Sequence, residues 1–114
     1  MRSLIILRPV AGVTLDQFMP LLVEEEKTLW GYLQSGAVRS INYAADHPGT
    51  IVLDFETETA DQARTLAEQF PIAQAGLFEI EVLGLAPYQG LAALFDPAHA
   101  IPPQLPAAWM ATLG

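Results

Sequence analysis

Apolar side chains recur at helical spacing along residues 15–33 of this chain. Thr14 and Gln17 have the spacing of a capping box that would begin the helix, and Gly36 would end it. Pro20 falls in the second turn, where it predicts a bend or a delayed start. At about 100° per residue, one stripe of this predicted helix contains Leu15, Phe18, Met19, Leu22, Leu29, Trp30 and Leu33.

One carboxylate, Glu26, falls inside this apolar stripe. The flanks and back of the helix are already polar, so the stripe itself has no need of a charge. Burial of a carboxyl group raises its pKa towards neutrality, where it suits a general base. Glu26 is therefore the candidate catalytic residue. Alternatively it is a structural carboxylate paired with an arginine or with Tyr43, or a small rotation of the helix exposes it.

Strands and a second helix are expected in the rest of the chain. The second, shorter helix follows Thr59, which has Gln62 at capping-box spacing, and Pro71 would stop it. The segments with the composition or alternation of β-strands are residues 3–8, 37–45, 51–56 and 77–85. Within the second of these, the alternation places Val38 with Ser40 and Asn42, opposite a side that holds Arg39, Ile41 and Tyr43.

The predicted order of elements is therefore β-α-β-β-α-β. Right-handed crossovers fold this order into a four-stranded antiparallel sheet with both helices on one face, a ferredoxin-like α+β layout. We expect the first and third strands to be central and parallel to each other. That arrangement would bring Arg8, Arg39 and Glu56 to one end of the sheet.

The second face of this sheet would be uncovered and semi-polar. Two such faces closing on each other would form a dimeric barrel. Composition also favours a homo-oligomer, because 52% of residues are apolar and 16% are charged, more apolar surface than one small domain can bury. The residues expected on this face are Val52, Asp54, Glu56, Leu77, Glu79, Glu81 and Leu83.

Length and charge narrow the class of protein. A chain of 114 residues is the usual size of one domain, and 13 acidic residues stand against five scattered basic ones, which disfavours nucleic acid and membranes as partners. The absence of cysteine excludes a disulfide framework, a thiolate nucleophile and a cysteine-ligated zinc site. The N-terminal residues have the pattern of a strand rather than a leader, so a cytoplasmic protein is expected.

Two regions differ in composition. Residues 1–95 hold all the predicted strands and long helices and form the expected ferredoxin-like domain. Residues 96–114 form a tail rich in proline and alanine that is too apolar to be solvated. We expect this tail to pack on its own domain or on a neighbouring subunit.

Further candidate binding residues come from the strands and the long helix. Arg8 and Arg39 are the cations placed on strands, so either could bind a substrate carboxylate, unless they pair with nearby acids. Trp30 and Tyr43 could line a ligand cavity, or they could belong to the core. Glu56 completes the set of candidate substrate-binding residues.

Histidine is not expected to act in catalysis or metal binding. Asp46 and His47 precede Pro48 and Gly49, which is the composition of a turn rather than of a catalytic dyad. The second histidine, His99, lies far away in the sequence and no ligand spacing joins the two. We therefore expect no metal and no cofactor.

A series of short motifs runs through residues 2–95: Leu29-Trp30, Gly36-Ala37-Val38-Arg39, Tyr43, Asp46, Pro48-Gly49, Glu56, Phe70-Pro71-Ile72, Ala75-Gly76-Leu77-Phe78, Leu85-Ala86-Pro87 and Leu94-Phe95. With these motifs, residues 2–95 resemble the muconolactone isomerase-like family of the dimeric α+β barrel superfamily. YCII-type relatives of that fold carry a His-Asp pair, for which this chain has no histidine in its first strand or first helix.

The resemblance implies a small, carboxylated or oxygenated apolar ligand, because the enzyme that names the family shifts a double bond in a lactone carboxylate by cofactor-free proton transfer. Our hypothesis from the residues is a pocket between the helices and the sheet in which a lactone or enol acid is isomerised, with Glu26 as base and Arg39 or Arg8 as anchor. One alternative is a non-catalytic ligand-binding or assembly module in which Glu26 is structural. Another is a cofactor-independent monooxygenase, which would require a larger cavity.

Overall fold

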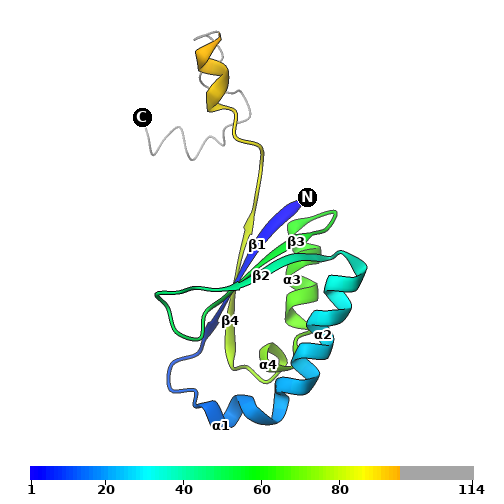
Figure 1. Cartoon of the computed structure of the whole chain (residues 1–114), viewed down its shortest axis with the longest axis vertical. Helices are drawn as coiled ribbons and strands as arrows, with labels where there is room; N and C mark the ends of the chain where they lie inside the picture. Colours follow the sequence, from blue (N-terminus) through cyan, green and yellow to red (C-terminus); the bar gives the residue numbers. More distant parts are fainter. Residues whose placement is uncertain (96–114) are drawn as a thin grey trace.

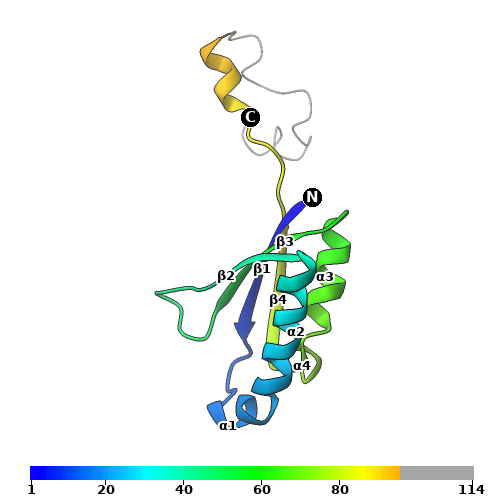
Figure 2. The ribbon, with the colours of Figure 1, turned by 45° about the vertical axis from the view of Figure 1, so that its right-hand side comes forward.

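Four strands form one antiparallel sheet in the order β2-β3-β1-β4. The computed structural model of the chain describes residues 1–95. The helices α2, α3 and α4 cover one face of the sheet (Figures 1 and 2). This arrangement confirms the predicted ferredoxin-like α+β fold. The strands are β1 (Arg2–Pro9), β2 (Val38–Tyr43), β3 (Ile51–Glu56) and β4 (Phe78–Gly84). The helices are α1 (Leu15–Phe18), η1 (Met19–Leu21), α2 (Leu22–Ser35), α3 (Ala60–Glu68), α4 (Pro71–Gln74) and η2 (Gly90–Leu94).

The two central strands, β1 and β3, run antiparallel, with Arg2 opposite Glu56 and Leu7 opposite Ile51. The prediction that they are parallel was wrong. A right-handed crossover makes β1 parallel to β2, and β3, which lies between them, is antiparallel to both. Arg8 therefore lies at the opposite end of the sheet from Glu56 and from Arg39.

Alternate residues of the central strands face the helices and form the core. Ile5 and Phe55 are completely buried there. The core is a single cluster, as expected for one domain of this size. Its members are Ile5, Leu7, Val38, Leu53, Phe55, Ala63, Ala67 and Phe70.

The predicted long helix is interrupted at Pro20. The backbone N–H of Thr14 donates to the Gln17 side chain at 2.8 Å, which confirms the capping box, and Gly36 ends α2 with a φ of 83°. Between α1 and α2 lies the 3₁₀ turn η1, with Pro20 near its start. The predicted bend is therefore confirmed.

The 3₁₀ turn changes which side of α2 faces the core. Each 3₁₀ residue turns by about 120° instead of about 100°, so three of them add about 60° to the rotation of everything that follows. Glu25, Leu29 and Tyr32 consequently face the interior. Glu26 and Trp30 are exposed, and the prediction that Glu26 is buried in an apolar stripe was wrong.

A β-bulge interrupts β2 at Arg39. The register shifts between Val38 and Ser40, so Val38 lies opposite Phe55 and Ile41 lies opposite Leu53. Residues directly opposite each other share a face of the sheet. Val38 therefore lies on the helix side with Ile41, whereas simple alternation had placed them on different sides.

The second face of the sheet carries apolar and charged side chains in alternation, as predicted. Two ion pairs lie across it, Arg2 with Asp54 at 2.6 Å and Arg8 with Glu81 at 2.5 Å. Between these pairs the strand pattern places Leu4, Ile6 and Val52, which are half-buried.

After β4 the chain leaves the sheet, and η2 stands away from the α/β body (Figures 1 and 2). Leu91, Leu94 and Phe95 are exposed in this segment. The predicted packing of residues 96–114 lies outside the described residues.

Candidate functional site

An open groove runs along the outer side of α2, away from the sheet. Its volume is about 430 Å³. Its walls come from one helix, because residues three, four and seven positions apart lie on one helical face. The groove is lined by Leu22, Val23, Glu26, Lys27 and Trp30.

Glu26 and Lys27 give this otherwise apolar groove one charge of each sign. On the helix, Val23 and Trp30 are seven residues apart and nearly in line, and Glu26 and Lys27 lie on the two sides of that line. Lys27 Nζ lies 3.2 Å from Glu24 Oε1, and both side chains are about two-thirds exposed, at 69% and 66%. Within residues 1–95, Glu26 makes no hydrogen bond or ion pair of its own.

Glu25, the preceding residue, is buried, whereas Glu26 is exposed. The exposed fraction of Glu25 is 8%, and its Oε1 accepts a hydrogen bond from the backbone N–H of Ile72 at 2.9 Å. Burial raises the pKa of the Glu25 carboxyl, the hydrogen bond from Ile72 opposes that shift, and the negative charge of Glu26 adds to it. Glu25 therefore ties α2 to the beginning of α4.

Tyr32 makes a second connection between the helices. Its hydroxyl donates to the backbone oxygen of Leu66 at 2.7 Å, and its ring packs edge-on against Phe55 and Phe70. Burial and the nearby charge of Glu25 raise the pKa of the Tyr32 hydroxyl. These aromatic rings occupy the space between α2 and the sheet, where a pocket was predicted. The groove that contains Glu26 lies on the other side of α2.

Sequence reasoning missed Glu25 and Tyr32. Both share a helical face with Leu29, at spacings of four and three residues, and that spacing was the available signal. It was hidden because the apolar stripe was drawn from Leu15 across Pro20 at a constant rotation of about 100° per residue.

The remaining predicted site residues do not gather around Glu26. Arg8 pairs with Glu81 on the open face of the sheet, and Glu56 lies 3.6 Å from the Met1 amino nitrogen. Arg39 lies at the bulge of β2, with a guanidinium nitrogen close to Gly36. Tyr43 is 81% exposed at the far end of β2. Of the predicted binding residues, Trp30 is the one that shares the groove with Glu26.

The Asp46-His47 segment forms the predicted turn between β2 and β3. His47 Nδ1 lies 2.8 Å from Asp46 Oδ1, and this hydrogen bond is the main cause of the lowered pKa of Asp46. Gly49 follows with a φ of 81°, and a Cβ atom there would lie 2.8 Å from the Pro9 ring. The turn is exposed and no other titratable group hydrogen-bonds to the pair in the described residues.

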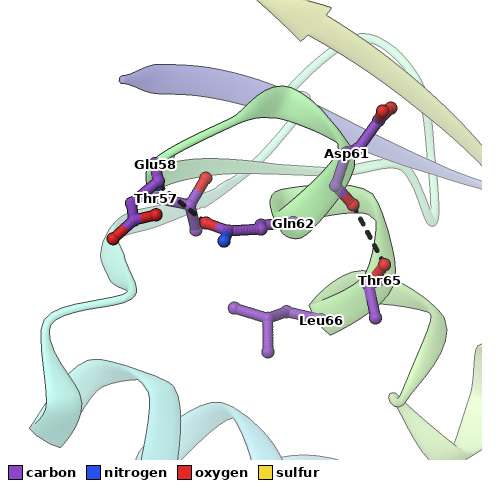
Figure 3. A pocket seen from close by; sticks show the side chains of 6 residues that line it. All are labelled: Thr57, Glu58, Asp61, Gln62, Thr65 and Leu66. Carbon is purple, nitrogen blue, oxygen red and sulfur yellow. Dashed lines mark hydrogen bonds between the residues drawn. The ribbon is translucent and has the colours of Figure 1, made fainter.

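A second hollow, of about 520 Å³, lies beside the first two turns of α3 (Figure 3). The backbone N–H of Glu58 donates to Gln62 Oε1 at 2.9 Å, and Thr65 Oγ1 donates to the backbone oxygen of Asp61 at 3.0 Å. These are helix-capping and helix-surface contacts, and the lining includes two acidic residues but, unlike the groove on α2, neither a cation nor an aromatic ring.

Two further kinds of feature, a metal-binding cluster and a membrane-spanning helix, are absent from residues 1–95. No group of three or more histidine, aspartate or glutamate side chains in this part of the chain could hold a metal ion. None of its helices is long and apolar enough to cross a membrane.

The architecture defines a ferredoxin-like α+β protein with one layer of helices on one face of its sheet. Muconolactone isomerase has the same fold, with a TM-score of 0.61 and 19% identity over 77% of this chain and 91% of that one. The 5-chloro-2-hydroxyhydroquinone dehydrochlorinase TftG of Burkholderia phenoliruptrix AC1100, solved with 2,5-dihydroxybenzoquinone, has a TM-score of 0.52 and 18% identity over 75% and 94% of the two chains. No protein-family model and no curated protein sequence matches this chain.

Proposed function

We propose that this chain is a small-molecule catabolic enzyme, an isomerase that moves a proton within a lactone or enol acid without a cofactor, and that Glu26 is its base. The observation that carries the proposal is a carboxylate without a protein partner in residues 1–95, set in an apolar groove. The two similar folds support it, since one is named as an isomerase of a lactone and the other as a dehydrochlorinase of a chlorinated hydroquinone.

The proposed isomerisation begins with removal of a proton from a carbon next to a carbonyl group. In the proposed isomerisation, Glu26 takes that proton and the C–H electron pair passes into an enolate. The same carboxyl then returns the proton to the far carbon of the conjugated system, which moves the double bond and regenerates the carboxylate. Atoms and electrons balance without an oxidant or reductant. Trp30 would form a flat wall against the ring.

The experiment is to measure turnover of muconolactone by the wild-type protein and by Glu26→Gln. Loss of the base should lower kcat by about 10²–10⁴-fold and leave the circular dichroism spectrum unchanged. The matched control is Glu25→Gln, which changes the neighbouring carboxylate and should keep most of the turnover. Equal activity of wild type and Glu26→Gln would remove Glu26 from the reaction.

We further propose that two copies associate through the open faces of their sheets. The alternation of Leu4, Ile6 and Val52 with ion-paired side chains supports this, because such a face is too apolar to remain in water yet is charged enough to set an orientation.

A non-catalytic assembly module is the second candidate, and one observation favours it. Leu15, Met19, Val23 and Trp30 are all more than half exposed along the outer side of α1 and α2. An assembly module would bury these side chains against another chain. In that case Trp30→Ala would dissociate the complex, and Glu26→Gln would have no effect on any turnover.

A further inference from the structure

We propose that Lys27 is the specificity-determining residue of the groove: its ammonium group binds the carboxylate of an anionic ring while Glu26 approaches the opposite edge of that ring. This inference rests on the proposed function of the groove. It assigns to Lys27 the anchoring role that the sequence had predicted for Arg39 or Arg8.

The placement of the cations leads to Lys27. The chain has five lysine and arginine residues. Arg2 and Arg8 are held by Asp54 and Glu81 on the open sheet face. Arg39 lies at the bulge of β2, and Arg64 is exposed on α3. Lys27 is the cation that lines the groove with Glu26.

The geometry of α2 places the charges of Glu26 and Lys27 far enough apart to contact two different edges of one ring. Consecutive helical residues point about 100° apart, so Glu26 and Lys27 lie on either side of the line from Val23 to Trp30. A flat ring lying along that line would present one edge to each charge. The carboxylate edge would meet Lys27 and the acidic C–H edge would meet Glu26.

The contact that Lys27 makes without a ligand is easily exchanged. Its partner, Glu24, lies three residues earlier on the same helix, and both side chains are largely in water, where ion pairs are weak. An anion bound beside Trp30 can therefore compete with Glu24 for Lys27. The chain also has a net charge of −8, so a local cation favours the approach of an anionic substrate to Glu26.

The test compares muconolactone, which carries a carboxylate, with its uncharged methyl ester. For Lys27→Met, KM for muconolactone should rise about two- to fivefold, as expected for loss of an exposed ion pair, with little change in kcat. The KM for the ester should not change, and Lys27→Arg should restore binding of the acid. Arg64→Met is the matched control, because it removes the same charge from the surface of α3 and should leave both KM values unchanged.

Binding provides a readout that is independent of turnover. The sequence has two tryptophans, so in a Trp109→Phe background the fluorescence of Trp30 reports on the groove. Muconolactone should quench it, and Lys27→Met should weaken that quenching for the acid only. If Glu26→Gln abolishes turnover but Lys27→Met changes neither KM nor quenching, the role of Lys27 is overturned and the isomerase proposal stands. Failure of the wild-type protein to bind muconolactone overturns the role of Lys27 directly.

Discussion

Glu25 Oε1 accepts a hydrogen bond from the backbone N–H of Ile72 at 2.9 Å, whereas its neighbour Glu26 on α2 makes no such contact within residues 1–95. Glu25 is buried against α4 and Glu26 lies in the outer groove. The pair allows the structural and chemical roles of a carboxylate to be separated with neighbouring substitutions on one helix.

Glu25→Ala should lower the free energy of unfolding by about 1–3 kcal/mol, because it leaves the buried N–H of Ile72 without an acceptor. Urea denaturation measures this difference. Glu26→Ala is the control and should stay within about 0.5 kcal/mol of wild type, since its side chain is exposed. A similar loss of unfolding free energy in both variants would contradict the structural role of Glu25.

The stability difference between wild type and Glu25→Gln should depend on pH. Because burial raises the pKa of Glu25 in the folded state, folding favours the protonated carboxyl. The contribution of Glu25 is therefore fully present below the ordinary glutamate pKa of about 4.3. It is lost as pH rises through the raised value and is constant above it. Urea denaturation of both proteins from pH 4 to pH 8 tests this, and curves that stay parallel would contradict it.

Tyr32→Phe should lower the free energy of unfolding by about 1 kcal/mol, because it removes the hydroxyl that donates to Leu66 and keeps the ring against Phe55. Tyr43→Phe provides the comparison, since the Tyr43 side chain is 81% exposed and its loss of a hydroxyl should have no effect. Thermal and urea denaturation of both variants measure the difference.

The proposed association through the sheet predicts a particle of twice the 12.4 kDa mass of one chain. Ile6→Glu would place a charge at the centre of the open face and should yield monomers in sedimentation velocity experiments. Gln69→Glu adds the same charge at an exposed position after α3 and should leave the mass unchanged. A wild-type protein that sediments as a monomer at micromolar concentration would rule out this interface.

Local signals in the sequence were sufficient for the ends of the helices and for the core-facing sides of β3 and α3. Thr14 with Gln17, Gly36 and Pro20 each act on the backbone nearby, so their effects could be predicted. The apolar positions of β3 and α3 also lie where their periodicity placed them.

The features that were predicted wrongly depend on relationships between segments. The direction of β3 follows from two connections together: the turn after Tyr43 makes β3 antiparallel to β2, and the α2 crossover makes β1 parallel to β2. The bulge at Arg39 has no sequence signal that we can identify. The rotation of α2 depends on a 3₁₀ turn that Pro20 permits but does not require.

The turn at Met19–Leu21 also sets the rotation of α2. One residue deleted there, with the rest of the connection unchanged, would turn α2 by about 100° relative to the sheet. Glu26 would then take the place that Glu25 now has beside Ile72, and Lys27 would take the place of Glu26. The length of a turn that contains no acidic residue thus determines which carboxylate of the following helix is buried.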